Sequence, residues 1–395
     1  MQLPFTGGII VANHHVRALL ASTLAAIIAS PFARAELSQL SSAQALAPTQ
    51  KAVSSDTPVR QQSRYSLTLI GSTYPNDPTR QFGVSDISDR GDVTGTRMGA
   101  DGRTIAFIWR DNVFRDLNDV LSAQDATVAA INDSLDVAGN LDDAQSQRYT
   151  YVLSGTGTLT TLVPPQGQRI SGVRDLNNSR QALLDMFDDV TGFQNAVWQD
   201  GLFSQLERLP DSARTAAVRI NDLGVVLGTA DDATGTGSRA VLWQNDTIMP
   251  LPQPEGSTFV TGIDISNGGV VVMDAIFPAA PAHRSVVVWQ EGQLSVLRPV
   301  RGLSSARPVD VSNRDVIVGI SSQDVLGAGP TATLWRGRAG IPVDLNARVL
   351  SDDPLKEFVH LQIGLLISDG GYIVARGEDS RDTDGRRSFY LLTPR

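Results

Sequence analysis

Hydrophobic and polar positions follow one another in the same order several times along the chain. In VRINDLGVVLG an extended apolar run ends at Ile220, a polar turn follows, and a β-branched run begins at Val225. The stretch IDISNGGVVVM has the same order around Ile265. Because Asn, Asp and Gly tolerate positive φ, such turns are typical of hairpins. The pattern therefore predicts short β-strands joined by tight turns.

Seven segments share this order, and each has an aliphatic anchor residue just before the turn. The anchors are Ile87, Ile131, Leu176, Ile220, Ile265, Val311 and Ile367, with spacings of 44, 45, 44, 45, 46 and 56 residues. Such periods indicate a repeat architecture, and four strands per repeat is the composition of a propeller blade. We predict an all-β fold, a seven-bladed β-propeller. The repeats lie near residues 82–125, 126–169, 170–213, 214–257, 258–303, 304–357 and 358–395.

The Trp residues keep step with the repeats. All five occupy the same slot in the third strand, namely Trp109, Trp198, Trp243, Trp289 and Trp335. The second repeat has YVLS there and the seventh has FYLL. We expect the indoles to fill the space between adjacent sheets with their N–H groups on backbone partners. The alternative is a ring of platforms for stacking sugars.

The two ends of the repeat region complement each other. The seventh repeat stops after residues 389–392 without a fourth strand, whereas a spare strand, YSLTLI, lies ahead of the first repeat at 65–70. We predict that this N-terminal strand closes the last blade, which removes exposed edges. The alternatives are an open solenoid, which would need capping repeats instead, and two unrelated β domains.

The repeats resemble a known group. The blocks INDLGVVLG and RAVLW, with the phrases FRDLND and VDLNARV, are similar to the bacterial extracellular HAF-type repeats, whose motifs read approximately INDxGxVVG, HAFLW and DLG or DLN. The resemblance covers about residues 82–395. The first position of the HAF triplet departs from His and is Ile105, Asn195, Arg239 or Ser285. The resemblance implies export and a β-propeller of repeats, and it confers no reaction.

The N-terminus is typical of a signal peptide. Arg17 precedes the apolar run ALLASTLAAIIASPF, and the small-x-small triplet Ala33-Arg34-Ala35 follows. This run is shorter than the roughly 20 residues that cross a bilayer. We expect residues 1–35 to be a signal peptide, with a buried amphipathic helix as the alternative. Residues 36–63 are a predicted flexible lead-in, and 64–395 the propeller of an exported, periplasmic or extracellular protein.

Charge and cysteine content exclude several kinds of partner and chemistry. The formal net charge is −9, and it becomes −11 when Arg17 and Arg34 are removed with the signal peptide. No basic run is present, which argues against nucleic acid and anionic membranes as partners. Without cysteine there is neither a disulfide nor a thiol nucleophile. We expect a monomer without an integral membrane segment in the mature chain.

One set of polar residues recurs at the position just before the anchor. The set comprises four acids and one base: Asp86, Asp175, Arg219, Asp264 and Asp310. These side chains would lie on the innermost strands, near one mouth of the central channel. Because buried carboxylates must be paired or hydrogen-bonded, the set predicts either hydrogen bonds between blades or an acidic pocket for a cation or a polyol.

A second, weaker signal concerns calcium. The segment SRDTDG at 380–385 partly matches an acidic calcium loop, with Asp382 and Asp384 as candidate ligands. Calcium takes six to eight oxygen ligands, and Ser380 stands where the first carboxylate is expected. A solvated loop is the alternative interpretation, and the sequence indicates no other cofactor.

The sequence assigns no catalytic residue. The chain has no GxSxG elbow, no phosphate-binding loop and no HExxH motif. Our first hypothesis is a non-catalytic scaffold that binds a glycan, a cell-surface component or a protein. The alternative is a polysaccharide hydrolase or lyase that uses two mouth carboxylates roughly 5–9.5 Å apart. An adhesin or an autotransporter-type passenger is a third possibility.

Overall fold

The computed structural model describes residues 63–74, 77–245 and 247–395, which form mainly β-strands. The predicted signal peptide at 1–35 and nearly all of the predicted lead-in at 36–63 lie outside the described residues. Within the described ranges, no helix has the length and apolar character needed to cross a membrane.

Four repeats each form a four-stranded antiparallel sheet in which consecutive strands pair. The first contains β2 (Phe82–Ile87), β3 (Val93–Met98), β4 (Thr104–Arg110) and β5 (Val113–Asp116). The second contains β6 (Asp125–Ile131), β7 (Val137–Asp142), β8 (Arg148–Leu153) and β9 (Leu159–Leu162). The third contains β10 (Gln168–Leu176), β11 (Ala182–Asp188), β12 (Gly192–Gln199) and β13 (Leu202–Gln205). The sixth repeat contains β22 (Ser305–Val311), β23 (Val316–Ser322), β24 (Thr331–Arg336) and β25 (Val343–Asp344).

The fourth and fifth repeats share an eight-stranded sheet. Its first half contains β14 (Ser212–Ile220), β15 (Val226–Asp232), β16 (Ser238–Gln244) and β17 (Thr247–Pro250). Its second half contains β18 (Phe259–Ile265), β19 (Val271–Phe277), β20 (His283–Gln290) and β21 (Gln293–Leu297). One parallel pair, Ser238 with Phe259, joins β16 to β18. The structure is thus all-β and propeller-like, and the predicted count of seven blades depends on how this sheet is divided.

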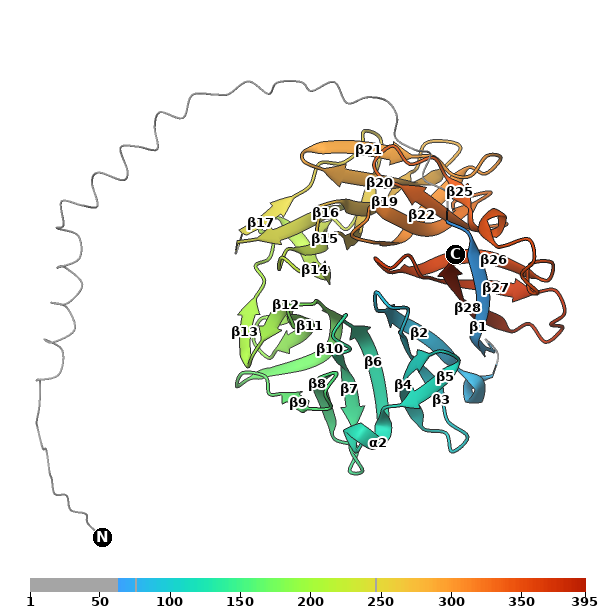
Figure 1. Cartoon of the computed structure of the whole chain (residues 1–395). Coiled ribbons are helices and arrows are strands. Elements are labelled where there is room, and N and C mark those ends of the chain that lie inside the picture. The colour runs from blue at the N-terminus through green and yellow to red at the C-terminus, as the bar shows by residue number, and fades with distance from the viewer. Residues whose placement is uncertain (1–62, 75–76, 246) are drawn as a thin grey trace, which may run out of the picture. The chain divides into compact units, whose positions relative to one another are not determined.

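The last sheet joins the two ends of the repeat region. It contains β26 (Val359–Ile367), β27 (Ile373–Asp379), β28 (Arg387–Pro394) and β1 (Tyr65–Thr73). Strand β1 runs antiparallel to β28, with Tyr65 opposite Pro394 and Thr73 opposite Arg387. In Figure 1 the blue β1 lies beside the dark red β28. The predicted pairing of residues 65–70 with the C-terminal strand is therefore confirmed.

The first strands of the repeats form the inner part of the fold. Each contacts the first strand of the next repeat, and β26 contacts β2, so the series closes on itself. The apolar clusters lie between neighbouring sheets. Trp243 packs against Leu183 and Ala217 and donates its indole N–H to the Glu207 carbonyl at 2.7 Å. Trp335 donates likewise to the Arg298 carbonyl at 2.8 Å, which confirms the structural interpretation for these two Trp residues.

Within the described part of the chain, three short helices interrupt the strands, and the sequence pattern did not predict them. They are η1 (Pro78–Arg80), α2 (Asn118–Leu121) and η2 (Leu345–Arg348). Helices α2 and η2 follow β5 and β25, and they arise from the related phrases FRDLND and VDLNARV. Each buries a Leu at or next to its start, Leu117 and Leu345 respectively.

Candidate functional site

The predicted hairpin turns lie together at one end of the inner strands. In each turn a polar side chain accepts at least one backbone N–H group of its own turn. Asn221, for example, accepts from Leu223 at 3.1 Å and from Val225 at 3.0 Å through Oδ1. Gly224 completes this turn with φ of +76°, a conformation that a residue with a Cβ adopts at a cost. The turns therefore present a fixed set of polar groups around a common centre.

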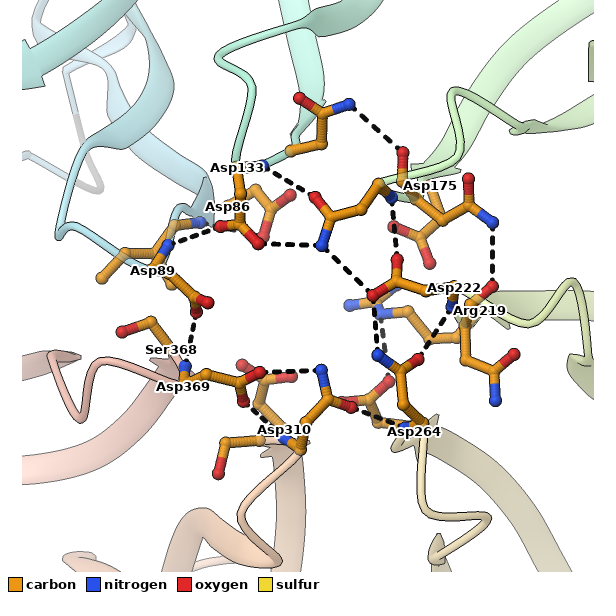
Figure 2. Close-up of a pocket in the computed structure, with 18 of the residues that line it drawn as sticks. Asp86, Asp89, Asp133, Asp175, Arg219, Asp222, Asp264, Asp310, Ser368 and Asp369 are labelled. Atoms are coloured by element: carbon orange, nitrogen blue, oxygen red, sulfur yellow. Dashed lines mark hydrogen bonds and ion pairs between the residues drawn. The ribbon is translucent and has the colours of Figure 1, made fainter.

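Seven Asp and Asn side chains form an outer ring at these turns. Each stands two residues after an anchor: Asp89, Asp133, Asn178, Asp222, Asn267, Asn313 and Asp369. The backbone N–H of each donates to the side-chain Oδ1 of the next, at 2.5–2.9 Å. Asp369 N–H donates to Asp89 at 2.7 Å and completes the circle. Figure 2 shows the ring with Asp89, Asp133, Asp222 and Asp369 labelled.

The outer ring was missed in the sequence analysis, although a signal for it exists. All seven repeats have Asp or Asn at this position. We interpreted these residues as turn formers, because Asp and Asn are common in turns for local reasons. The recurrence of a side-chain acceptor at this position in all seven repeats was the feature that could have revealed the ring.

The predicted candidate acids form an inner ring just below. Each of the four accepts the backbone N–H of the anchor in the following repeat. Asp86 accepts from Ile131 at 2.8 Å and Asp175 from Ile220 at 2.9 Å. Asp264 accepts from Val311 at 2.9 Å, and Asp310 accepts from Ile367 at 2.7 Å. The first of our two interpretations, hydrogen bonds between repeats, thus describes all four acids.

A backbone irregularity places these side chains. The pairing of first and second strands shifts register just before the inner-ring position in every repeat, for example between Val84 and Asp86 and between Gly262 and Asp264. Such bulges re-aim side chains. The carboxylates consequently reach across to the next sheet instead of following the regular alternation of the strand.

The two rings surround a polar cavity of about 160 Å³, here called the mouth cavity. Eight Asp side chains line it, and Arg219 is the single basic side chain among the described lining residues. The Nε atom of Arg219 lies 3.8 Å from Asp264 Oδ1, and 34% of the Arg219 side chain stays accessible. Figure 2 shows Arg219 between Asp175, Asp222 and Asp264. All five predicted site residues therefore meet in one cavity.

Burial and mutual repulsion shift the protonation of these acids. Burial and the charge of Asp175 raise the pKa of Asp86 to about 7. Burial and the neighbouring Asp264 carboxyl raise the pKa of Asp310 well above its ordinary value. Burial alone would lower the pKa of Arg219, but Asp175, Asp264 and the other acids raise it. Arg219 therefore stays charged while some of the acids take up protons near neutral pH.

Protonation of Asp86 predicts a pH dependence of stability. Its pKa is about 7 in the folded state and 3.8 when unperturbed, so between these values the folded protein binds more protons. The free energy of unfolding should therefore rise as pH falls from 8 to 5. We expect a contribution of about 1–2 kcal/mol, below the roughly 4 kcal/mol of an unscreened shift, because the Asp86 residue is only partly buried.

Urea unfolding at pH 8, 7, 6 and 5 measures this effect. The Asp86→Asn variant has no proton to bind there, so its stability should depend less steeply on pH. Because Asn also loses one acceptor towards Ile87 or Ile131, the slopes are compared and not the absolute values. A variant slope equal to that of the wild type would contradict the assignment.

The candidate calcium loop is arranged around an arginine. Asp382 lies 2.6 Å and Asp384 lies 3.1 Å from nitrogens of Arg386. Among the described residues, no group of three His, Asp or Glu side chains is placed to hold a metal ion. The two candidate ligands therefore come together, but on a guanidinium partner. Neither lines the mouth cavity.

Comparison with known proteins found similarity to solved structures alone. No protein-family model and no curated protein matches the chain. Similar solved structures are β-propeller proteins. A puromycin-hydrolyzing peptidase of Mycobacterium tuberculosis has 12% identity and a TM-score of 0.50, covering 80% of this chain and 52% of that one.

Two further structures have lower TM-scores. A streptogramin B lyase has 12% identity and a TM-score of 0.45, covering 84% of this chain and 98% of its own. YCF48 from Cyanidioschyzon merolae has 9% identity and a TM-score of 0.46, covering 83% and 99%. At these identities the likeness concerns the fold alone. The four-stranded antiparallel sheets and the closed series of inner strands make the chain a propeller-like repeat protein.

Proposed function

We propose that the protein is an exported seven-bladed β-propeller of the HAF-repeat type that serves as a binding scaffold. Its mouth cavity receives a positively charged group of a partner, such as a Lys or Arg side chain of a protein. The signal-peptide-like residues 1–35 and the HAF-like blocks support export. The closed order of the inner strands supports the propeller.

The count of seven follows if the eight-stranded sheet is two blades. A single residue pair joins the two halves of this sheet. Within the second half, by contrast, β18 and β19 pair along their length, from Phe259 opposite Ile276 to Ile265 opposite Val271. Each half also has its own anchor and its own outer-ring residue. The outer ring has seven members that donate in one circle.

The mouth cavity is the observation that carries the proposal. Eight carboxyl groups face one guanidinium there, so a further positive charge is favoured. The volume of about 160 Å³ is below the roughly 300–1,000 Å³ of pockets that enclose whole ligands. A single ammonium or guanidinium group therefore suits the cavity better than an oligosaccharide, and of the partner kinds considered we favour a protein.

Unlike Asp133, Asp222 and Asp369, Asp89 accepts no side-chain amide among the described residues, so we place the cation beside it. Its Oδ1 accepts the Asp369 N–H at 2.7 Å. Burial, followed by the charges of Asp133 and Asp369, raises the pKa of Asp89. A cation placed beside these three acids would relieve their repulsion.

The polysaccharide hydrolase or lyase alternative has lost its main support. It required two of the four inner acids in an open arrangement, free to act on substrate. All four accept anchor N–H groups from the neighbouring repeat. Their raised pKa values follow from burial and mutual charge, which a structural role explains equally well.

Calorimetry with a hexalysine peptide tests the proposal. We expect saturable binding that weakens as salt is raised, because screening acts on exposed charges. The Asp89→Asn variant should bind about threefold to tenfold more weakly. Since Asn occupies this ring position in three repeats, the variant keeps the Oδ1 acceptor and the fold.

The control is Asp211→Asn, which removes an exposed charge from the loop between β13 and β14. Equal losses in the two variants would mean that the peptide senses only net charge, and the proposal would be wrong. A neutral oligosaccharide panel and Ca²⁺ are included in parallel. Binding of either without binding of hexalysine would also overturn it.

A further inference from the structure

The Trp slot of each repeat has a defined set of neighbours. It is the third-strand residue that pairs with the start of the second strand, as Trp243 pairs with Val226. Trp243 packs in one apolar cluster with Val226 and with Val197 and Leu206 of the preceding repeat. Trp243 thus places its indole between its own sheet and the sheet of the preceding repeat.

Trp335 has the equivalent surroundings. Its cluster contains Ile317 of its own sheet together with Val288 and Leu297 of the preceding repeat. It pairs with Ile317, and its side chain is fully buried. The indole is thus held at both junctions by the same three positions, which we call the wall positions. One is the start of its own second strand (Val226 or Ile317), and two belong to the preceding repeat (Val197 and Leu206, or Val288 and Leu297).

The second repeat lacks the indole. The slot is held by Leu153, which pairs with Val137, so the structure shifts our alignment of YVLS by one residue. The three wall positions are here Ile108, Leu117 and Val137. These residues and Leu153 line a cavity of about 360 Å³ between the sheets β2–β5 and β6–β9, which we call the junction cavity.

The walls of the junction cavity are apolar and its rim is charged. Val113 and Val120 line it and are 65% and 41% exposed, which leaves apolar surface at the entrance. At the rim, Arg110 Nε lies 3.3 Å from the buried Asp92 carboxylate. The volume lies within the range of small-molecule pockets, roughly 300–1,000 Å³.

Helix α2 changes what the cavity can recognise. The carbonyl that accepts the indole N–H at the Trp243 junction belongs to Glu207. The equivalent carbonyl here belongs to Asn118, and it accepts the N–H of Ala123 at 2.9 Å within the turn of α2. A guest would therefore be held by ring shape and apolar contact, without the need for an N–H donor.

We propose that the junction cavity binds a small planar aromatic molecule of the size of an indole. The fold itself shows that a flat ring of this size fits between two sheets at this position, because indoles of the chain occupy it at the Trp243 and Trp335 junctions. The site shares no lining residue with the mouth cavity. It is independent of the proposed cation-binding function.

Titration with indole and with naphthalene, followed by calorimetry or by NMR shifts, tests the proposal. We expect saturable 1:1 binding with a Kd of about 0.1–1 mM, typical of ligands with about ten heavy atoms. The Leu153→Trp variant supplies the missing indole from the chain and should weaken binding at least about tenfold. Its melting temperature should not fall.

Two further variants distinguish a loss of binding from a loss of the fold. Val120→Asp puts a charge in the half-exposed wall and should weaken binding about tenfold while the fold is kept. Val163→Trp adds an indole at a site that is 77% exposed and outside the cavity, and it should bind as the wild type does. Absence of saturable binding to the wild type, or wild-type binding by both Leu153→Trp and Val120→Asp, would overturn the proposal.

Discussion

Replacement of Arg219 by Met is expected to lower the free energy of unfolding by about 2–3 kcal/mol at pH 8. Removal of one partner from a buried ion pair costs about 3–5 kcal/mol because the other charge is left unpaired. We expect less here, since 34% of the Arg219 side chain is accessible and water screens the acids. Arg219 is nevertheless the only base among the described residues that line the cavity.

The loss of stability caused by Arg219→Met should depend on pH. At pH 5 the acids with raised pKa values, Asp86 and Asp310 among them, bind protons and no longer need a positive neighbour. The destabilisation should then fall below about 1 kcal/mol. Urea unfolding of wild type and variant at both pH values measures the difference.

Arg219→Lys is the matched control. It keeps the charge and should recover most of the stability at pH 8. A loss that is the same at pH 5 and pH 8 would show that Arg219 acts through packing of its stem and not through its charge. That outcome would contradict the electrostatic account of the inner ring.

Deletion of β1 is expected to abolish stable folding. A chain that begins at residue 74 lacks the buried side chains of Tyr65, Leu67 and Ile70. Burial of such side chains contributes about 1.5–3 kcal/mol each, so the loss is about 5–9 kcal/mol, comparable with the whole stability of many proteins. The deletion also leaves β28 as an unpaired edge.

A circular permutant separates this loss from a general effect of truncation. Tyr65 lies opposite Pro394, and Arg395 N–H donates to the Arg64 carbonyl at 2.8 Å. Residues 63–73 joined after Arg395 through a short turn can therefore pair with β28 as a hairpin. We expect this permutant, with its start at residue 77, to fold, and circular dichroism with thermal melting to show it.

Two outcomes would contradict this account. A chain from residue 74 with a wild-type melting temperature would mean that ring closure contributes little. A permutant as unstable as the deletion would mean that β1 acts through its link to residues 74–81 and not through β28. A chain from residue 63 serves as the reference in both comparisons.

The sequence predicted the strands well because their signals are local and repeated. The alternation of apolar residues and the turn residues after each anchor recur at nearly constant spacing, so one repeat checks another. The pairing of residues 65–70 with the last strand was also predictable, since one end had a strand in excess and the other lacked one. Helices α2 and η2 were not predicted, because four residues carry too little periodicity to distinguish a helix from a loop.

The sequence also located the inner-ring acids, but it left their role open between two interpretations. Their partners are backbone N–H groups 45–57 residues further along the chain, and no local pattern encodes such a partner. The outer ring was missed because its Asp and Asn residues also suit turns for local reasons. Its closing bond joins Asp369 to Asp89 across 280 residues.

The sequence by itself therefore determined the repeat, its strands, its turns and the complementary ends, because each depends on neighbours a few residues apart. Only the tertiary structure decided what the polar residues do and where space is left. The eight acids share one cavity because the closed series of inner strands brings the turns of all repeats together. The junction cavity exists because Leu153 is smaller than an indole at a place that only the packing of two sheets defines.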